Sequence, residues 1–451
     1  MSKQKIQLSD HFDYSRLLRF VLPCVGTMLF TSIYGIVDGL CVSNFVGKTA
    51  FAAVNLIMPV PMLVGSVGFM LGTGGSAIVG ITLGEGDREK ADRYFSLFVW
   101  TGLVAGLLLA VVGFFAVRPA ASLLGAKGEM LDYAVRYGRL LMACLPFFIL
   151  QNMFQSFFVT AENPHLGFAF TVAAGVTNMV LDVVLVGMLH GGVEGAAIAT
   201  FISQAVGGVL PVFYFLNKRS TSSIHLGRAQ WNGGVIRSAC INGSSELMTN
   251  LSMSLVNILY NYQLLRFAGE NGVAAYGVIM YAAFLFVAVF VGYAVGSAPI
   301  VSYHYGARNH AELNNLYSKS LRLIGVIAVV MTALSMLVIP YVARIFVGYD
   351  AELLALTSHA FRVYALNFFL MGFNVYGSSF FTALGDGVTS ALISFLRTLL
   401  FQLLALILLP MVLGIEGVWL AVTAAEAGAL CVTVLMFITK DKVFHYRKVS
   451  C

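Results

Sequence analysis

The sequence is poor in charged residues. Only 11% of its 451 residues are Asp, Glu, Lys or Arg, whereas 59% are hydrophobic. Soluble domains carry about 25% charged residues, so this composition excludes an ordinary soluble domain and indicates a chain that crosses a membrane many times. No long polar stretch could form a soluble catalytic domain, and we therefore do not expect an enzyme.

Paired cysteines are also missing, and no cleavable leader is expected. The 6 cysteines are scattered, with no Cys-x-x-Cys pair. This argues against a disulfide framework or a cysteine metal site, and we interpret these residues as small apolar packing groups. The polar start of the chain predicts that no signal peptide is removed.

Long apolar runs are what the sequence has in abundance. A membrane-spanning helix needs roughly 20 apolar residues. Twelve such runs are found, at about 16–44, 52–82, 94–117, 131–158, 165–189, 194–217, 234–267, 272–303, 317–346, 354–384, 388–413 and 417–439. They are continuous rather than alternating, which excludes a transmembrane β-barrel. We predict an all-α polytopic membrane protein whose main partner is the lipid bilayer.

The basic residues are unevenly distributed between the two ends of these runs. With the N-terminus in the cytoplasm, 19 of the 27 Lys and Arg residues, Arg397 among them, fall on the inner side and 8 on the outer side. The positive-inside rule therefore predicts that both termini are cytoplasmic. This bias is a topology signal, and no nucleic-acid partner is expected.

The two halves of the chain repeat each other at an offset of 222 residues. The gap-free matches are Ala52-Ala53 with Ala274-Ala275, Ile57-Met58 with Ile279-Met280, Ile78-Val79 with Ile300-Val301, Gly84 with Gly306, Ser156 with Ser378, Thr160-Ala161 with Thr382-Ala383, and Glu194-Gly195 with Glu416-Gly417. We predict a six-helix lobe at 1–217, a cytoplasmic linker at 218–233 and a second six-helix lobe at 234–451. Because six is even, the repeat is parallel, with a pseudo-two-fold axis along the membrane normal.

Paired bundles around a central cleft are typical of transporters, since rocking one bundle against the other alternates access. A channel is the less favoured interpretation, because most channels of this size build the pore from several copies or from re-entrant loops. A sensor or assembly scaffold would want a soluble domain, which is missing.

Four polar positions of the first half are apolar or aromatic in the second. Asp38 corresponds to Tyr260, Asn178 to Leu400, Asp182 to Leu404 and Thr200 to Val422. All four polar residues fall in the outer half of the bilayer, roughly 10–16 Å below its edge at the helical rise per residue. Asn178 and Asp182 are four residues apart and share one helix face.

The two aspartates are the strongest indication of function. A carboxylate at membrane depth costs about 2.5–3.5 kcal/mol, and no Lys or Arg lies near either one in its span. Carboxylate, amide and hydroxyl oxygens are hard donors suited to Na⁺. Alternatively, the two carboxyl groups repel in a low dielectric and hold a proton. The sequence leaves both open, so Asp38, Asn178, Asp182 and Thr200 are a candidate Na⁺ or H⁺ coupling site.

Three further residues are weaker candidates. Glu246 lies near the start of the seventh run. It could pair with a cationic substrate in a central cavity, or it could simply be solvated at the cytoplasmic surface. Tyr34 lies one turn before Asp38, and we predict that it binds substrate together with Asp38, Asp182 and Glu246. Pro23 removes a backbone hydrogen bond and is a candidate hinge.

Several motifs resemble those of a known family. The segments are "LPCVGTMLFTSIYGIVDGLCVSNFVG", "AAVNLIMPV", "GTGGSAIVGITLGEGDREKA", "NMVLDVVLV" and "GVEGAAIATFISQ", with "YGARNHAEL" as an echo of "GEGDREKA" in the second half. They are similar to those of the prokaryotic multidrug and toxic compound extrusion (MATE) transporters, within the multidrug, oligosaccharidyl-lipid and polysaccharide exporter superfamily.

The resemblance implies twelve helices in two lobes and export of organic cations in exchange for Na⁺ or H⁺. It also implies that Asp38, Asn178, Asp182 and Thr200 form a first-lobe cation site. Members with an aspartate on the tenth helix differ from this chain, since "FNVYGSSFFTALG" has none. We expect a monomer in the cytoplasmic (inner) membrane with no cofactor. The alternative is a flippase for lipid-linked oligosaccharide, which would need a basic cavity.

Overall fold

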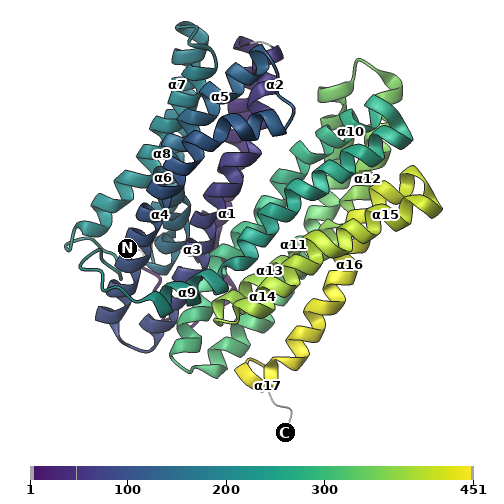
Figure 1. The fold of residues 1–451 in the computed structure, drawn as a ribbon. Coiled ribbons are helices and arrows are strands. Elements are labelled where there is room, and N and C mark those ends of the chain that lie inside the picture. Colours follow the sequence, from purple (N-terminus) through teal and green to yellow (C-terminus); the bar gives the residue numbers. More distant parts are fainter. Residues whose placement is uncertain (1–4, 47, 448–451) are drawn as a thin grey trace.

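The computed structural model describes residues 5–46 and 48–447, and within these the chain is helical, with no strand (Figure 1). The α-helices are α1 (Tyr14–Phe45), α2 (Lys48–Ile57), α3 (Pro59–Gly84), α4 (Arg88–Leu123), α5 (Glu129–Ala143), α6 (Leu145–Thr160), α7 (Pro164–Leu181), α8 (Gly192–Leu216), α9 (Gly233–Asn242), α10 (Ser244–Gly306), α11 (His310–Val347), α12 (Ala351–Ala365), α13 (Phe368–Ala383), α14 (Gly387–Phe395), α15 (Phe401–Leu413), α16 (Ile415–Thr439) and α17 (Asp441–Phe444). Two π-helical segments, η1 (Asp182–Met188) and η2 (Leu396–Leu400), follow α7 and α14.

The predicted number of membrane spans is confirmed. In the part of the chain that the structure describes, nine helices are long and apolar enough to cross a membrane. Two bent pairs, α5 with α6 and α12 with α13, are long and apolar enough when each pair is counted as one span. The 63-residue α10 holds a non-helical residue, Gly269 (φ 58°), which divides it into two arms. Glycine reaches this positive φ without a steric penalty. With α10 as two spans, the total is twelve.

Two of the predicted runs are not single straight helices. Helices α5 and α6 meet at an angle of 55°. Pro146 stands at the start of α6, and because proline disfavours helical geometry in the residue before it, the break falls just ahead of it. Helices α12 and α13 meet at 45°. There the side chain of Asn367 donates to the carbonyl of Tyr364 and competes with continuation of the helix.

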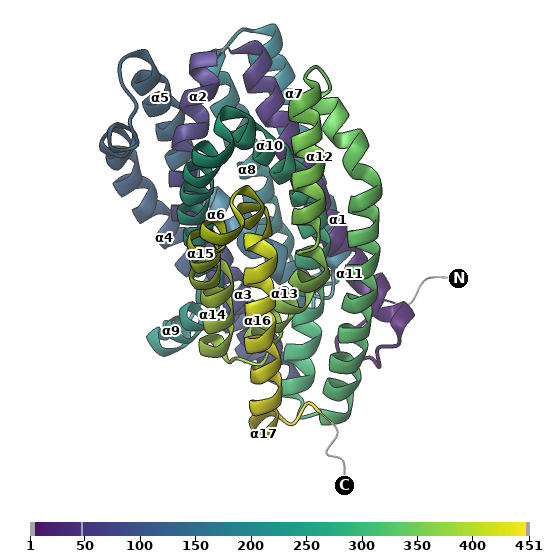
Figure 2. The same ribbon diagram turned by 90° about the vertical axis from the view of Figure 1, so that its right-hand side faces the viewer.

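The helices form two bundles. The first lobe comprises α1–α8 and the second α10–α16, and the ribbons of the two lobes diverge toward one end (Figure 1). Figure 2 looks onto the second lobe, with the first lobe behind it. The limits 1–217 and 234–451 stay a prediction. The connecting segment between α8 and α9 packs on the first lobe. There the N–H of His225 donates to Asp92 Oδ1 at 2.8 Å, and the N–H of Gly227 donates to Ser96 Oγ at 2.9 Å.

Glycines let the lobes meet at the other end. A Cβ atom on Gly84 of α3 would lie 2.0 Å from the carbonyl oxygen of Tyr303, and one on Gly306 of α10 would lie 2.0 Å from that of Ile81. Gly84 and Gly306 are repeat equivalents, as are Ile81 and Tyr303. The two helices therefore touch backbone to backbone in a symmetric manner.

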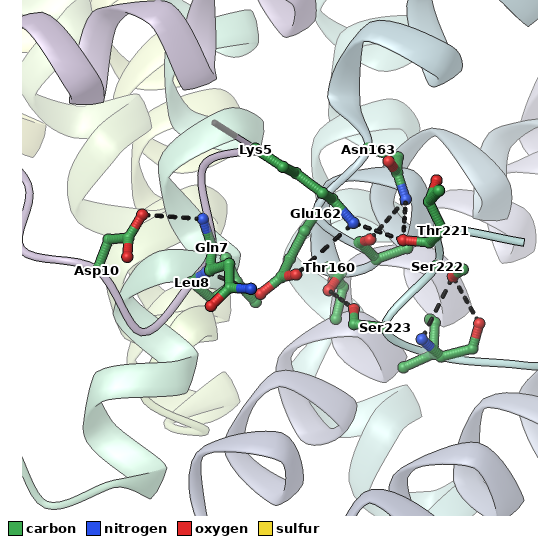
Figure 3. A network of polar contacts seen from close by, with 12 residues as sticks. Lys5, Gln7, Leu8, Asp10, Thr160, Glu162, Asn163, Thr221, Ser222 and Ser223 are labelled. Carbon is green, nitrogen blue, oxygen red and sulfur yellow. Dashed lines mark hydrogen bonds and ion pairs between the residues drawn. The ribbon is translucent and has the colours of Figure 1, made fainter. Parts of the chain in front are cut away.

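The segment before α1 joins both lobes at this end. The N–H of Leu8 donates to Glu162 Oε1 at 2.8 Å, and Lys5 reaches the carbonyl of Thr221 (Figure 3). On the second lobe, the N–H of Phe12 donates to Glu312 Oε1 at 2.9 Å. The N-terminal segment thus bridges the α6–α7 turn and the start of α11.

The outer surface carries long apolar faces. Exposed residues on α4 include Leu108 at 64%, Val112 at 65% and Phe115 at 71%. On α11, Leu337 is 69% exposed and Tyr341 67%. Such continuous apolar surfaces are unstable in water and fit contact with lipid tails.

Candidate functional site

The structure brings the two predicted aspartates together. Asp38 of α1 and Asp182 at the start of η1 come within hydrogen-bonding reach of each other. Asp182 is fully buried and Asn178 is 2% exposed. Among the described residues, Asp38 Oδ1, both Asp182 carboxyl oxygens and Asn178 Nδ2 have no hydrogen-bond partner. Buried polar atoms without partners are costly, so these atoms are available to bind a further species.

The local helix geometry explains how this face forms. The N–H of Asp182 donates to the carbonyl of Asn178, so the two side chains stack one helical turn apart. The helix then widens into the π-helical segment η1. Such segments are rare and often occur at functional sites. Ser203 of α8 donates to the carbonyl of Ala174 at 2.8 Å and fastens α8 to this helix.

Thr200 and an unpredicted tyrosine complete the cluster. Thr200 donates to the carbonyl of Ala196 at 3.0 Å, which leaves its oxygen free to accept. Tyr137 of α5 is fully buried and lies beside Thr200 and both carboxyl groups. The repeat gives no signal for Tyr137, because its equivalent, His359, is also polar. In the structure the side chain of His359 bonds Glu416 instead, at 2.8 Å.

Tyr34 lies next to the cluster, and its role toward substrate stays a prediction. It is close enough to Asp38 for the charge of that carboxylate to act on it. Its ring packs against α7, where a Cβ atom on Gly175 would lie 3.1 Å from Tyr34 Cδ1. Pro23 stands inside α1, which continues through it, and Thr27 donates to its carbonyl at 2.9 Å. The hinge role of Pro23 stays a prediction.

The donor set of this cluster fits a hard cation or a proton. No basic side chain in the described chain acts on Asp38 or Asp182. Residues 5–46 and 48–447 contain no group of three or more His, Cys, Asp and Glu that could hold a metal. Any cation here would therefore rely on the oxygens of Asn178 and Thr200 as well as the two carboxylates, which suits Na⁺ better than a transition metal.

Glu246 does not join this cluster. It lines a cavity of about 110 Å³ between the lobes, together with Thr73 and Ser76 of α3, Ser378 of α13 and Arg397 of η2. The predicted central position therefore agrees with the structure, whereas its role toward substrate stays a prediction.

A buried ion pair in the second lobe was missed. Arg397 Nε donates to Glu426 Oε1 at 2.9 Å, and their side chains are 13% and 0% exposed. Sequence topology placed Arg397 at the cytoplasmic end of its helix because it lies near the start of a predicted run. Glu426 has another polar residue, Gln204, as its repeat equivalent, and its partner 29 residues away has no local signature.

Comparison with known proteins agrees with this architecture. The MatE family model matches residues 23–184 and 247–407, which are corresponding parts of the two halves. The multidrug export protein MepA of Staphylococcus saprophyticus is 22% identical over 95% of each chain. The MepA of Staphylococcus haemolyticus is 23% identical over 97% of this chain and 95% of its own.

A solved structure of a MATE protein in complex with MaL6 superposes with a TM-score of 0.92 at 24% identity, covering 98% of this chain and all of the other. At that identity the likeness shows the fold, and the family rests on the model match, which covers well over half of the sequence. This chain belongs to the MATE family of multidrug efflux transporters.

Proposed function

We propose that the protein is a secondary antiporter that exports amphipathic organic cations in exchange for Na⁺ or H⁺. The observation that carries this proposal is the buried pair Asp38 and Asp182, whose carboxyl oxygens have no basic partner in the described chain. Two carboxyl groups in contact in a low dielectric need a cation or a proton between them. Such a site can exchange one positive species for another.

The proposed cycle uses the two lobes as a two-state element. Substrate and coupling ion compete for the first-lobe site, and each biases the equilibrium only by its differential affinity for the two states. Inward movement of one positive charge at about 100 mV supplies roughly 2.3 kcal/mol. Within this cycle Asp38, Asn178, Asp182 and Thr200 hold the ion, Tyr34 and Glu246 contact the substrate, and Pro23 allows α1 to bend.

We further propose a monomer in the cytoplasmic membrane, with both termini in the cytoplasm and no cofactor. The distribution of Lys and Arg supports this orientation. The end at which the lobes meet through Gly84 and Gly306 is then the cytoplasmic end. The named relatives support multidrug export as the activity. A flippase for lipid-linked oligosaccharide is disfavoured, because the first-lobe site is acidic and an anionic headgroup needs basic partners.

The test is transport by the purified protein in proteoliposomes. Uptake of a fluorescent cation such as ethidium is followed with a Na⁺ gradient alone and with a pH gradient alone. We expect one of the two gradients to drive accumulation against the ethidium gradient. Absence of accumulation under both gradients, with a correctly inserted protein, would exclude the antiport proposal.

A further inference from the structure

Each lobe holds a partly open chamber, and the two chambers share repeat-equivalent positions. The first-lobe chamber, of about 50 Å³, is lined by Met58, Pro61, Met62, Thr200 and Gln204, among others. The second-lobe chamber, of about 100 Å³, is lined at the five corresponding positions by Met280, Ala283, Phe284, Val422 and Glu426. The first-lobe chamber adjoins the acidic site through Thr200. The pseudo-two-fold axis therefore relates it to a second chamber to which the proposed transport cycle assigns no role.

The second chamber has a different chemical character. Tyr260 stands where the first lobe has Asp38, and it stacks on Tyr276 with ring centroids 4.7 Å apart and planes 9° from parallel. Tyr364 and Met371 line the same chamber. Stacked aromatic rings and flexible thioethers favour flat aromatic ligands, because they offer π faces and adaptable apolar contact.

The guanidinium group of Arg397 lies between this chamber and the central cavity. Arg397 and Thr249 line both spaces, so the two spaces adjoin. Glu426 holds Arg397 through Nε, and the second oxygen of Glu426 accepts from Asn374 Nδ2 at 2.7 Å. The guanidinium also acts electrostatically on Glu246, which lies one helical turn from Thr249.

Of these three groups, Glu246 is the one without a basic partner of its own. Glu246 and Glu426 are two carboxyl groups, and Arg397 is the one basic side chain that acts on them within the described residues. Arg397 is committed to Glu426 by a short hydrogen bond. Glu246 is therefore the carboxyl group that lacks a positive partner, and a single ammonium group can pair with it.

We propose that the second-lobe chamber is the subsite for the aromatic ring of the substrate, whose ammonium pairs with Glu246 in the adjoining cavity. The ligand class is a flat aromatic monocation. This assignment rests on the proposed export of organic cations and adds where the ring is bound. The ring subsite and the first-lobe acidic site, where substrate and coupling ion compete in the proposed cycle, therefore lie in different lobes.

The test compares binding of ethidium, a flat aromatic monocation, with that of tetraethylammonium, which has no ring. Met280→Trp fills the second-lobe chamber, and Met411→Trp, at a position on α15 that is 75% exposed, is the matched control. By calorimetry on the purified protein we expect Met280→Trp to weaken ethidium binding about tenfold, the scale of losing an aromatic contact together with its buried area. Tetraethylammonium binding by this variant, and both ligands in the control, should stay unchanged.

Unchanged ethidium affinity in a folded Met280→Trp variant would overturn the proposal. A measurement on the unmodified protein covers the case in which that variant does not fold. Light-activated ethidium azide should label peptides of α10 that contain Tyr260 or Tyr276, whereas labelling confined to the first lobe would also overturn the subsite. If ethidium labels the second lobe but no gradient drives its transport, the subsite stands and the antiport proposal fails.

Discussion

Gly80 of α3 faces Ser302 of α10, the residue that the internal repeat makes its own equivalent. A Cβ atom on Gly80 would lie 2.8 Å from the Cβ of Ser302. Equivalent positions can touch each other only on the two-fold axis, as in the isologous interface of a symmetric dimer. The axis that relates the lobes therefore passes through the α3–α10 contact, and this contact closes one end of the molecule.

This geometry predicts the effect of adding a methyl group beside the axis. In Gly84→Ala the new Cβ would collide with the backbone of Tyr303, which cannot move as a side chain tip can. We expect a loss of about 1–3 kcal/mol of stability in the closed arrangement, the usual cost of overpacking. Melting temperature measures the stability, and spin-label distances between the lobes measure the closure.

The matched control is Gly277→Ala on the same α10, where a Cβ would meet nothing within 4 Å. It should leave both the melting temperature and the interlobe distances unchanged. Equal behaviour of Gly84→Ala and Gly277→Ala would mean that the backbone contact between the lobes does not form.

A second prediction concerns pH and the turn before α14. Asp386 accepts hydrogen bonds from Lys440 Nζ and from the Thr389 hydroxyl, each at 2.7 Å. Burial raises the pKa of the Asp386 carboxyl, but the bonds from Lys440 and Thr389 outweigh it and hold the pKa below its usual value of 3.8. A lowered pKa means stabilisation that is complete above about pH 5 and is lost as the pH falls through the folded-state pKa.

Asp386→Asn should therefore lower the melting temperature at neutral pH, and the difference from the unmodified protein should shrink as the pH falls from 5 toward 3. Thermal unfolding in detergent at a series of pH values measures this. A difference that is the same at every pH would show that the carboxylate charge does not contribute.

The sequence was sufficient for features that depend on composition and on the repeat. Continuous apolar runs predict spans because lipid imposes helices, and the equivalence of the halves singled out Asp38 and Asp182 as unlike Tyr260 and Leu404. Depth along two helices then placed the aspartates at one level. The equal depth of the two aspartates and their contrast with the second half are consistent with their proximity in the structure. Both can be read from the sequence without side-chain packing.

Features that depend on packing between distant helices were not predictable. Tyr137 reaches the acidic site from α5. Nothing in the sequence of its own span indicates that its side chain contacts polar groups instead of packing in the hydrophobic core. The sequence indicates only that Arg397 lies near the end of a helix, because position along an apolar run predicts the depth of a side chain but not its ion-pair partner. The pair with Glu426 exists only because η2 and α16 pack together.

Tyr137 itself gives a third prediction. Its hydroxyl is buried and makes no hydrogen bond of standard geometry within the described residues, although Thr200, Asp38 and Asp182 lie close to it. Removing an unpaired buried hydroxyl is close to neutral or stabilising for the fold. We therefore expect Tyr137→Phe to keep or raise the melting temperature while weakening the apparent affinity for the coupling ion in proteoliposomes. A large loss of stability would mean that the hydroxyl is bonded, and unchanged ion affinity would mean that it takes no part in the site.

The last prediction tests the acidic pair directly. Asp182→Asn keeps the shape of a fully buried side chain and removes its ability to carry a negative charge. Because the proposed cycle holds one positive species between Asp38 and Asp182, we expect gradient-driven ethidium transport to fall to the level of empty liposomes. The same substitution at Asp132, exposed on α5, is the control and should transport at the unmodified rate. Size-exclusion chromatography and melting temperature establish that Asp182→Asn is folded and inserted. Transport by the folded variant at the unmodified rate would place the coupling site elsewhere in the chain.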